Sequence, residues 1–550
     1  MKKISPQILQ WMKITTIMTA LAALSACGGG GYGSDDDSSS GSGGGYTSPP
    51  ALADQDSDGY ADNADNCVAV SNPDQADADA DGSGDACDTL PDRYEFTDAA
   101  GADTVSYTGQ TKRQILLSDL VDAMLALTEN AANATSDLDF YFRYNSTTSD
   151  TIVSSFKLDG ETLLPNNGNT PSAMTYGSIS SGKDLVGKIA GGDGAGGGDP
   201  NTMIDANMIG WAGGDADPLP VEFVDAMFAE LIAISVDGVT PTVTTTGGVA
   251  VQIPNVYTSA EGIDYRQMIQ KFLLGAVNLS QATNDYLKAD FANMLALEGS
   301  NAYTAGEHDW DEAFGYFGAA RNYNEYSDEE IKGAGGRADY ANGYNDANAD
   351  SLIDVRSEVN LAQSTNCAKR DLGTASNTNP TDFTKEAFDA FILGREILKN
   401  AAAAGEITTA AQTALDAAAT TAGLTMEKCQ AATVVHYIND VIADYADVDS
   451  VTAEYADIGT FTNLTKHWAE MKGFALGLQF AGFSPFVDAA VRSDLTTILT
   501  KMGDHPVIAD GTQGGVVYVG GITQYIADLT DARDLLEAAY GFDSENVANW

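Results

Sequence analysis

The acidic stretch from residue 54 to residue 88 divides this chain into two unlike parts. It reads Asp54-Gln-Asp-Ser-Asp-Gly-Tyr-Ala-Asp-Asn-Ala-Asp-Asn-Cys67 and, after a short interval, Asp77-Ala-Asp-Ala-Asp-Gly-Ser-Gly-Asp-Ala-Cys-Asp88. Residues 1–53, ahead of it, hold an apolar segment and a polar linker. Only residues 94–550, behind it, are numerous enough to bury a sizeable core.

The acids in this stretch are spaced as in calcium-binding loops. Ca²⁺ takes about six to eight oxygen ligands, and a twelve-residue loop supplies them from positions 1, 3, 5, 7, 9 and 12, with glycine at position 6. Counted from Asp54 or from Asp77, acids stand at positions 1, 3, 5, 9 and 12, and position 6 is Gly59 or Gly82. The alternative is an acidic disordered linker. The predicted calcium ligands are Asp54, Asp56, Asp58, Asp62, Asp65, Asp77, Asp79, Asp81, Asp85 and Asp88.

Three short motifs of this stretch resemble the thrombospondin type 3 repeat: Asp-Asn-Cys67, Asn72-Pro-Asp-Gln and Gly82-x-Gly-Asp-x-Cys-Asp. The resemblance covers residues 54–88 of a predicted module 54–90. It implies a backbone wrapped around calcium with little apolar core, and a disulfide between Cys67 and Cys87. Val68 stands where the family usually has proline.

Residues 1–26 are typical of a bacterial export signal. Lysines precede an apolar run that ends at Ala26, which is too short and wrongly flanked for a membrane span. The run closes with Leu24-Ser-Ala-Cys27, which resembles the bacterial lipobox and implies cleavage before Cys27 and acylation of its sulfur. Gly28 follows, which in that pattern favours the outer membrane. The alternative is plain secretion with a free Cys27.

Residues 27–53 form a flexible Gly-, Ser- and Asp-rich linker behind the lipid. The formal net charge of the whole chain is −51, which excludes nucleic acid or an anionic bilayer as a partner of the protein surface. Membrane contact is therefore expected through the lipid alone, in the cell envelope, facing either the periplasm or the outside. A hydrophobic content of 43% indicates a globular protein.

Two cysteines remain after the lipobox and the repeat. Cys367 and Cys429 are an even pair in an exported protein, so a disulfide between them is predicted. The alternative is two buried thiols.

Residues 94–550 show apolar residues at helical spacing, and in one segment Leu464, Trp468 and Met471 begin a single stripe. The predicted fold is mainly α, a helical bundle or two fused bundles with long loop insertions at 159–218 and 238–262. Helices are predicted at Gln114–Leu127, Pro220–Ile234, Tyr265–Leu297, Phe383–Lys399, Val434–Tyr445, Leu464–Phe480 and Ile522–Tyr540. The few strand-like pieces are Thr151–Leu158, Val249–Ile253 and Val516–Val519.

The four histidines are the remaining candidates for chemistry. Acids three or four residues from a histidine share its helix face, and inward-facing pairs of this kind build metal sites in bundles. The alternative is that these histidines are satisfied core residues. The predicted transition-metal ligands, for iron or zinc, are His308, Asp311, Glu312, His467 and Glu470.

Four stretches resemble the bacterial lipoprotein family catalogued as domain of unknown function 4856: Tyr107–Arg113, Glu307–Phe317, Phe388–Arg395 and Lys466–Glu470. This resemblance covers residues 94–550 and implies no assigned activity. His467-x-x-Glu is also similar to the signature of imelysin-like proteins, which are helical, exported and linked to iron uptake, some being described as metallopeptidases. That resemblance implies metal ligation by the pair.

One more acidic loop lies within the large domain. Asp346, Asn348, Asp350 and Asp354 stand at positions 1, 3, 5 and 9 of a calcium loop, with an apolar residue at position 8. Position 6 is Ser351 instead of glycine. A third calcium site is therefore predicted, with an Asx-rich turn as the alternative.

The sequence predicts a calcium-binding, membrane-anchored lipoprotein whose helical domain binds a ligand or a transition metal, with iron acquisition as one role. The first alternative is an imelysin-like metallopeptidase, and the second is a structural or adhesive surface module. No Gly-Lys-Ser/Thr loop, Gly-x-Ser-x-Gly or His-Glu-x-x-His is present, which favours binding over catalysis.

Overall fold

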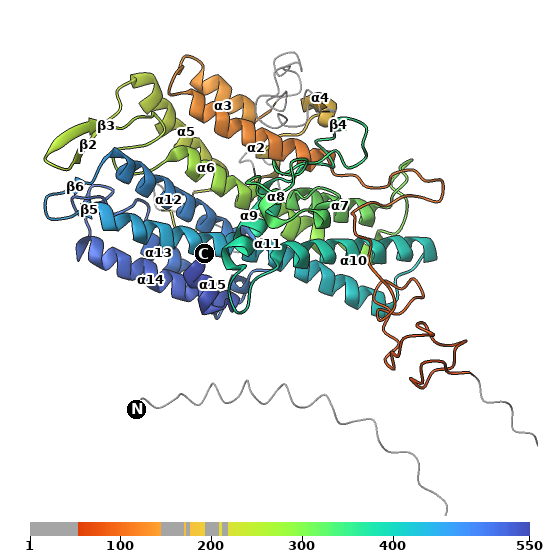
Figure 1. The fold of residues 1–550 in the computed structure, drawn as a ribbon. Coiled ribbons are helices and arrows are strands. Elements are labelled where there is room, and N and C mark those ends of the chain that lie inside the picture. Colours follow the sequence, from red (N-terminus) through yellow and green to blue (C-terminus); the bar gives the residue numbers. More distant parts are fainter. Residues whose placement is uncertain (1–52, 145–169, 172–175, 193–207, 212–217) are drawn as a thin grey trace, which may run out of the picture. The chain divides into compact units, whose positions relative to one another are not determined.

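The computed structural model describes residues 53–144, 170–171, 176–192, 208–211 and 218–550 (Figure 1). The signal peptide, Cys27, nearly all of the linker, the predicted strand Thr151–Leu158 and most of the predicted insertion 159–218 lie outside these residues. Contacts divide the chain into a unit of residues 1–53 and a unit of residues 54–550.

The described part of the second unit is mainly α, as predicted, with fourteen α-helices and little strand. The longer helices are α2 (Thr108–Ala126), α3 (Ala134–Phe142), α5 (Pro220–Asp237), α6 (Tyr265–Leu273), α7 (Ala305–Phe317), α9 (Ala362–Thr374), α10 (Phe383–Ala404), α11 (Thr409–Asp444), α12 (Ile458–Gly477), α13 (Arg492–Met502) and α14 (Gly521–Tyr540). The short ones are α4 (Tyr176–Ile179), α8 (Asp328–Ile331) and α15 (Ser544–Asn549).

The centre of the bundle is the row α10, α11, α12 and α6, in which each helix packs along the next (Figure 1). The stripe predicted on α12 is confirmed, because Leu464, Trp468 and Met471 are fully buried. α11 is much longer than the helix predicted at Val434–Tyr445. Its first half is rich in alanine, which strongly favours helix. Because alanine occurs on both the buried and the exposed face, no clear apolar periodicity marks this half in the sequence.

Cys367 of α9 and Cys429 of α11 form the predicted disulfide and are both fully buried. The bridge joins two neighbouring helices across a sequence separation of 62 residues. Linking distant positions in this way restricts the unfolded chain more than a short loop does. No helix in the described part combines the length and the apolar composition needed to cross a membrane.

The prediction of one continuous α-helix at Tyr265–Leu297 is wrong. α6 ends at Leu273 and is followed by two π-helical segments, Leu274–Leu279 and Gln281–Asp285. Here the chain crosses α12 at close range: a Cβ on Gly275 would lie 2.4 Å from the Cα of Gly477. The apolar pattern of the sequence continues through this crossing, but the hydrogen-bond register does not.

The strands form small sheets at the surface of the bundle. Pairs are β1 (Thr170–Pro171) with β4 (Leu352–Ile353), and β7 (Thr512–Gln513) with β8 (Val516–Val517). A third sheet has the order β3-β2-β6-β5, from β3 (Val249–Gln252), β2 (Thr242–Thr245), β6 (Glu454–Tyr455) and β5 (Val448–Asp449).

The segment 238–262, predicted as a loop insertion, is instead a hairpin followed by packed chain, and its second strand β3 (Val249–Gln252) confirms the strand predicted at Val249–Ile253. Gly247 and Gly248 turn between β2 and β3 with φ of 85° and 72°, values that suit glycine in a tight hairpin. Ile253 and Thr258 beyond the hairpin are each about 1% exposed. The polar composition of the segment reflects its turn and strand faces and does not prevent it from packing.

Candidate metal-binding loops

The first acidic loop is folded by backbone N–H groups that donate to its own carboxylates. The N–H of Gly59 donates to Asp54 at 3.3 Å, and the N–H of Asp58 donates to Asp56 at 3.3 Å. Gly59 has a φ of 105°, so the turn at the sixth position requires glycine. Asp54, Asp56 and Asp58 bring one oxygen each within 4.8 Å of one another. Three of the five acids predicted for this loop therefore converge, whereas Asp62 and Asp65 are not part of this group.

The second loop repeats the first. The N–H of Gly82 donates to Asp77 at 3.1 Å, and Gly82 again has a positive φ, of 97°. The N–H of Asp81 donates to Asp79 at 3.3 Å. Asp77, Asp79 and Asp81 likewise gather one oxygen each within 4.8 Å. In each loop the N–H at position 2 also donates to the acid at position 9, which here is Asp85.

Three carboxylate oxygens of the two loops are buried without a hydrogen-bond partner in the described chain. They are Oδ2 of Asp56, Oδ2 of Asp65 and Oδ1 of Asp77. The other oxygen of Asp65 accepts from the N–H of Cys67 at 2.8 Å and from the amide of Gln75 at 3.0 Å, so one oxygen remains available. A buried anionic oxygen without a donor is unfavourable. A cation would satisfy all three.

The electrostatics of the second loop favour the same occupant. Burial raises the pKa of Asp79 to about 6, and the negative charges of Asp81, Asp88 and Asp77 add to the effect. Asp88, at position 12 of the loop, is thus close enough to act on position 3. Carboxylates that repel one another in this way favour a divalent cation between them. The donor set is oxygen only, which suits Ca²⁺.

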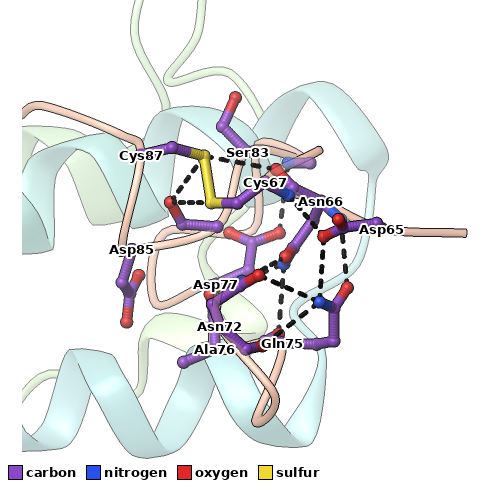
Figure 2. Close-up of a disulfide and its surroundings, with 12 residues drawn as sticks. Asp65, Asn66, Cys67, Asn72, Gln75, Ala76, Asp77, Ser83, Asp85 and Cys87 are labelled. Carbon is purple, nitrogen blue, oxygen red and sulfur yellow. Dashed lines mark hydrogen bonds between the residues drawn. A yellow bond between two sulfur atoms is a disulfide. The ribbon is translucent and has the colours of Figure 1, made fainter. Parts of the chain in front are cut away.

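The two loops are tied together where they meet. Figure 2 shows the disulfide between Cys67 and Cys87, which confirms the bridge that the repeat resemblance implied. Beside it, the amide of Asn66 donates to the carbonyl of Gln75 at 3.1 Å. Gly84 packs against this junction so tightly that a Cβ would lie 2.5 Å from Asn66 Oδ1. These contacts hold the loops in shape by covalent and hydrogen bonds instead of an apolar core.

The loop at Asp346 shares part of this geometry. The N–H of Ser351, with a φ of 70°, donates to Asp346 at 2.9 Å, as position 6 does in the other loops. Both oxygens of Asp354, however, accept from the guanidinium of Arg356 at 2.8 Å. Glu358, which the sequence reasoning missed as part of the loop, accepts from the N–H groups of residues 347 and 354. The third calcium site stays a prediction.

Of the two acids predicted beside His308, Glu312 lies near its ring and Asp311 does not. His308 Nδ1 lies 2.7 Å from a carboxylate oxygen of Glu298, and its Nε2 lies 3.9 Å from Glu312. Asp311 is fully buried and accepts from the Tyr94 hydroxyl at 2.7 Å and from Arg395 Nε at 3.0 Å. Asp311 is therefore engaged in an ion pair between α7 and α10.

The second predicted pair is also divided. His467 Nδ1 lies 2.8 Å from Asp444, whose hydrogen bond and charge outweigh burial and raise the pKa of His467. Glu470 instead lies 3.4 Å from Lys271 and 3.6 Å from Lys466. In the part of the chain that is described, only the two aspartate triads gather three or more metal-binding side chains within 4.8 Å. His308, Asp311, Glu312, His467 and Glu470 form no such group.

Comparisons with known proteins agree with one of the resemblances. Residues 222–404, from α5 to the end of α10, match the family model described as Domain of unknown function (DUF4856). The match includes His308 but ends before His467. No curated protein and no solved structure matches the chain. The match carries no activity, and neither the thrombospondin repeat nor the imelysin resemblance receives support from it.

The sequence reasoning missed a second group of polar side chains, which lines a cavity beside the π-helical segments. It includes Gln114, Lys271, Asn278 and Lys369. The one signal available was the asparagine within the apolar run Leu273-Leu-Gly-Ala-Val-Asn-Leu279. A polar residue in such a run usually marks a hydrogen-bonded or functional position.

Proposed function

We propose that residues 54–88 bind two calcium ions in a lipid-anchored protein of the bacterial envelope, and that the helical domain behind them binds a ligand. The observation that carries the calcium proposal is the pair of carboxylate triads, with buried oxygens that have no partner among the described residues. Each triad sits in a loop with glycine at the position where the turn needs it.

The ligand chemistry favours calcium over other metals. The candidate ligands are carboxylates and backbone carbonyls, with no imidazole and no free thiolate, because both cysteines of the repeat are bonded to each other. Zinc and iron prefer sites with nitrogen or sulfur donors. Mg²⁺ needs stricter octahedral geometry and keeps several waters. In the first loop Asp54, Asp56, Asp58 and Asp65 would hold the ion, and Asp77, Asp79, Asp81 and Asp88 would hold the second.

The envelope location is supported by the lipobox-like ending of the signal at Cys27 and by the linker behind it. The two disulfides agree with an oxidising compartment. Replacement of Cys27 by alanine should abolish incorporation of labelled fatty acid and release the protein from the membrane fraction. Labelling that persists in the Cys27 variant would contradict the anchor.

Ligand binding by the helical domain is favoured over peptide hydrolysis. A zinc peptidase needs about three protein ligands converging on one open position. His308, His467 and Glu470 instead face Glu298, Asp444 and two lysines. The polar cavity that includes Gln114, Lys271, Asn278 and Lys369 gives the binding role a physical site.

Calcium content of the full-length chain tests the proposal. The double variant Asp56→Asn/Asp79→Asn removes one charged ligand from each loop and is expected to hold about two fewer calcium ions per chain than the wild type. Asp74→Asn is the matched control, because Asp74 is an exposed acid of the same repeat outside the ligand positions. Metal analysis after equilibrium dialysis and calorimetric titration would report both.

Equal calcium in the double variant and the wild type would overturn the assignment. Because the measurement is a difference between chains, any calcium held at the Asp346 loop cancels. Chelation should also make residues 54–88 more sensitive to protease, since the gathered carboxylates then repel one another. The control variant should behave like the wild type in both respects.

A further inference from the structure

A polar cavity lies between α2, the first π-helical segment and α9. Its volume is about 160 Å³. Amide and ammonium groups dominate its lining, from Gln114, Gln270, Lys271, Asn278, Asn366 and Lys369. The chain contains 79 acidic residues, yet none of those that the structure describes lines this cavity. The lining therefore carries positive and neutral polar groups, whereas the protein as a whole is strongly negative.

Three buried amide atoms of this cavity have no hydrogen-bond partner among the described residues. Asn278 is fully buried, and neither its Oδ1 nor its Nδ2 has a hydrogen-bond partner among the described residues. Gln114 donates through Nε2 to the carbonyl of Gly315, but its buried Oε1 has none. Buried polar groups in folded proteins are nearly always hydrogen-bonded. A molecule in the cavity would need both donors and acceptors to satisfy them.

The backbone presents Asn278 in an unusual way. This residue belongs to the π-helical segment Leu274–Leu279, where the wider turn changes the direction of side chains relative to α6. π-Helical turns within α-helices occur frequently at functional sites. Gly275, one turn earlier, packs against Gly477 of α12 and so fixes the segment from the opposite side.

The two lysines of the cavity differ in their partners. Lys271 Nζ donates to Gln270 at 2.6 Å and lies 3.4 Å from Glu470, which balances its charge. Lys369 forms no ion pair with a carboxylate of the described residues. Reduced hydration and the charges of Lys271 and Arg370 lower the pKa of Lys369 to about 8, so it remains a cation at neutral pH. The cavity therefore carries about one uncompensated positive charge.

We propose that this cavity binds a small organic monocarboxylate, whose carboxylate pairs with Lys369 and whose second polar group hydrogen-bonds to Asn278. A cavity of about 150 Å³ holds a benzene-sized molecule, so the ligand has about six to eight non-hydrogen atoms. An amino acid is disfavoured, because no carboxylate of the described residues lines the cavity to receive its ammonium. A hydroxy acid meets these requirements, because its hydroxyl group can donate to an amide oxygen as well as accept from an amide nitrogen. The proposal rests on the ligand-binding role of the helical domain and is independent of the calcium loops.

Titration calorimetry and thermal unfolding of the full-length chain test this with acetate, lactate, pyruvate and succinate as probes. Lactate should bind and raise Tm, and pyruvate, whose keto group accepts but does not donate, should bind more weakly. Lactamide, the neutral counterpart of lactate, should bind roughly tenfold more weakly or not at all. Repeating the titration with and without calcium separates this site from the loops, because loss of calcium binding alone would leave the carboxylate response in place.

Two variants locate the binding. Lys369→Met, at an exposed position, should weaken lactate binding by roughly tenfold or more. Lys332→Met is the matched control, because Lys332 is an exposed lysine close enough to act on Lys369 electrostatically but does not line the cavity. Asn278→Leu should abolish the response without lowering Tm, since it removes an amide that has no partner. Failure of lactate to bind, or equal lactate binding by Lys369→Met and the wild type, would overturn the proposal.

Discussion

Replacement of Arg395 by methionine should destabilise the helical domain strongly. The Arg395 side chain is fully buried in α10, with Nη1 2.6 Å from Glu307 and Nε 3.0 Å from Asp311, both on α7. Nη2 also donates to the Thr104 hydroxyl at 3.0 Å. Methionine fills similar space but leaves Asp311 buried with only neutral donors. Breaking a buried ion pair from one side typically costs about 3–5 kcal/mol.

The size of the loss should depend on pH. Burial raises the pKa of Asp311 above its ordinary value, and Arg395 opposes that effect. Without Arg395 the folded-state pKa rises further, so the folded variant binds a proton that the unfolded chain releases. Stability of the variant therefore falls as pH rises through this range, and the loss should be smaller near pH 5 than near pH 8, by roughly 1 kcal/mol or more.

Urea unfolding followed by tryptophan fluorescence measures this, because the fully buried Trp310 lies on the same helix as Asp311. The double variant Arg395→Met/Asp311→Asn should recover about 1–2 kcal/mol, since the more deeply buried of the two carboxylates left without Arg395 is then neutral, while Glu307 remains. Lys399→Met, on the exposed face of α10, is the control. A loss below about 1 kcal/mol for Arg395→Met, or no recovery in the double variant, would refute the reasoning.

Two further changes probe other parts of the core. Burial raises the pKa of Glu427 to about 7. The free energy of unfolding of the wild type should therefore decrease as the pH rises from about 5 to about 8. Glu427→Gln should remove this pH dependence and be roughly 3 kcal/mol more stable than the wild type near pH 8. An equal difference in unfolding free energy between the wild type and Glu427→Gln at pH 5 and at pH 8, measured by urea unfolding, would contradict this. Gly394→Ala should destabilise by about 3 kcal/mol or more, because its Cβ would lie 1.9 Å from the Trp310 ring. Thermal unfolding checks this, and an unchanged Tm would show that the ring can move.

The calcium loops show how much local sequence can determine. Asp54 and Asp58 lie four residues apart, and the Gly59 turn between positions 5 and 7 brings the acids together without help from distant residues. The apolar stripe on α12 could likewise be predicted from the sequence, because its residues recur at the helical period and all face the core. In both cases the interacting groups are close in sequence, so spacing alone specifies the geometry.

The helix boundaries and the helical site were not determined in this way. The apolar run after Tyr265 has the composition of one long helix, yet contact between Gly275 and Gly477 accompanies its change to π-helix. Spacing placed His467 and Glu470 on one face of the same helix. In the structure His467 instead contacts Asp444 of α11, and Glu470 contacts Lys271 of α6. Residue type and period do not say which neighbour a polar side chain will meet.

Sequence by itself therefore determined the local features of this protein: the mainly helical character, the two acidic loops and the positions of the bonded cysteines. Tertiary structure decided which charges pair and where polar groups remain unsatisfied. Asp311 meets Arg395 across a separation of 84 residues, and Gln114 lines the same cavity as Lys369. Contacts between residues so distant in sequence depend on how the helices pack against one another, because the energy of a buried charge or amide is set by all the groups around it.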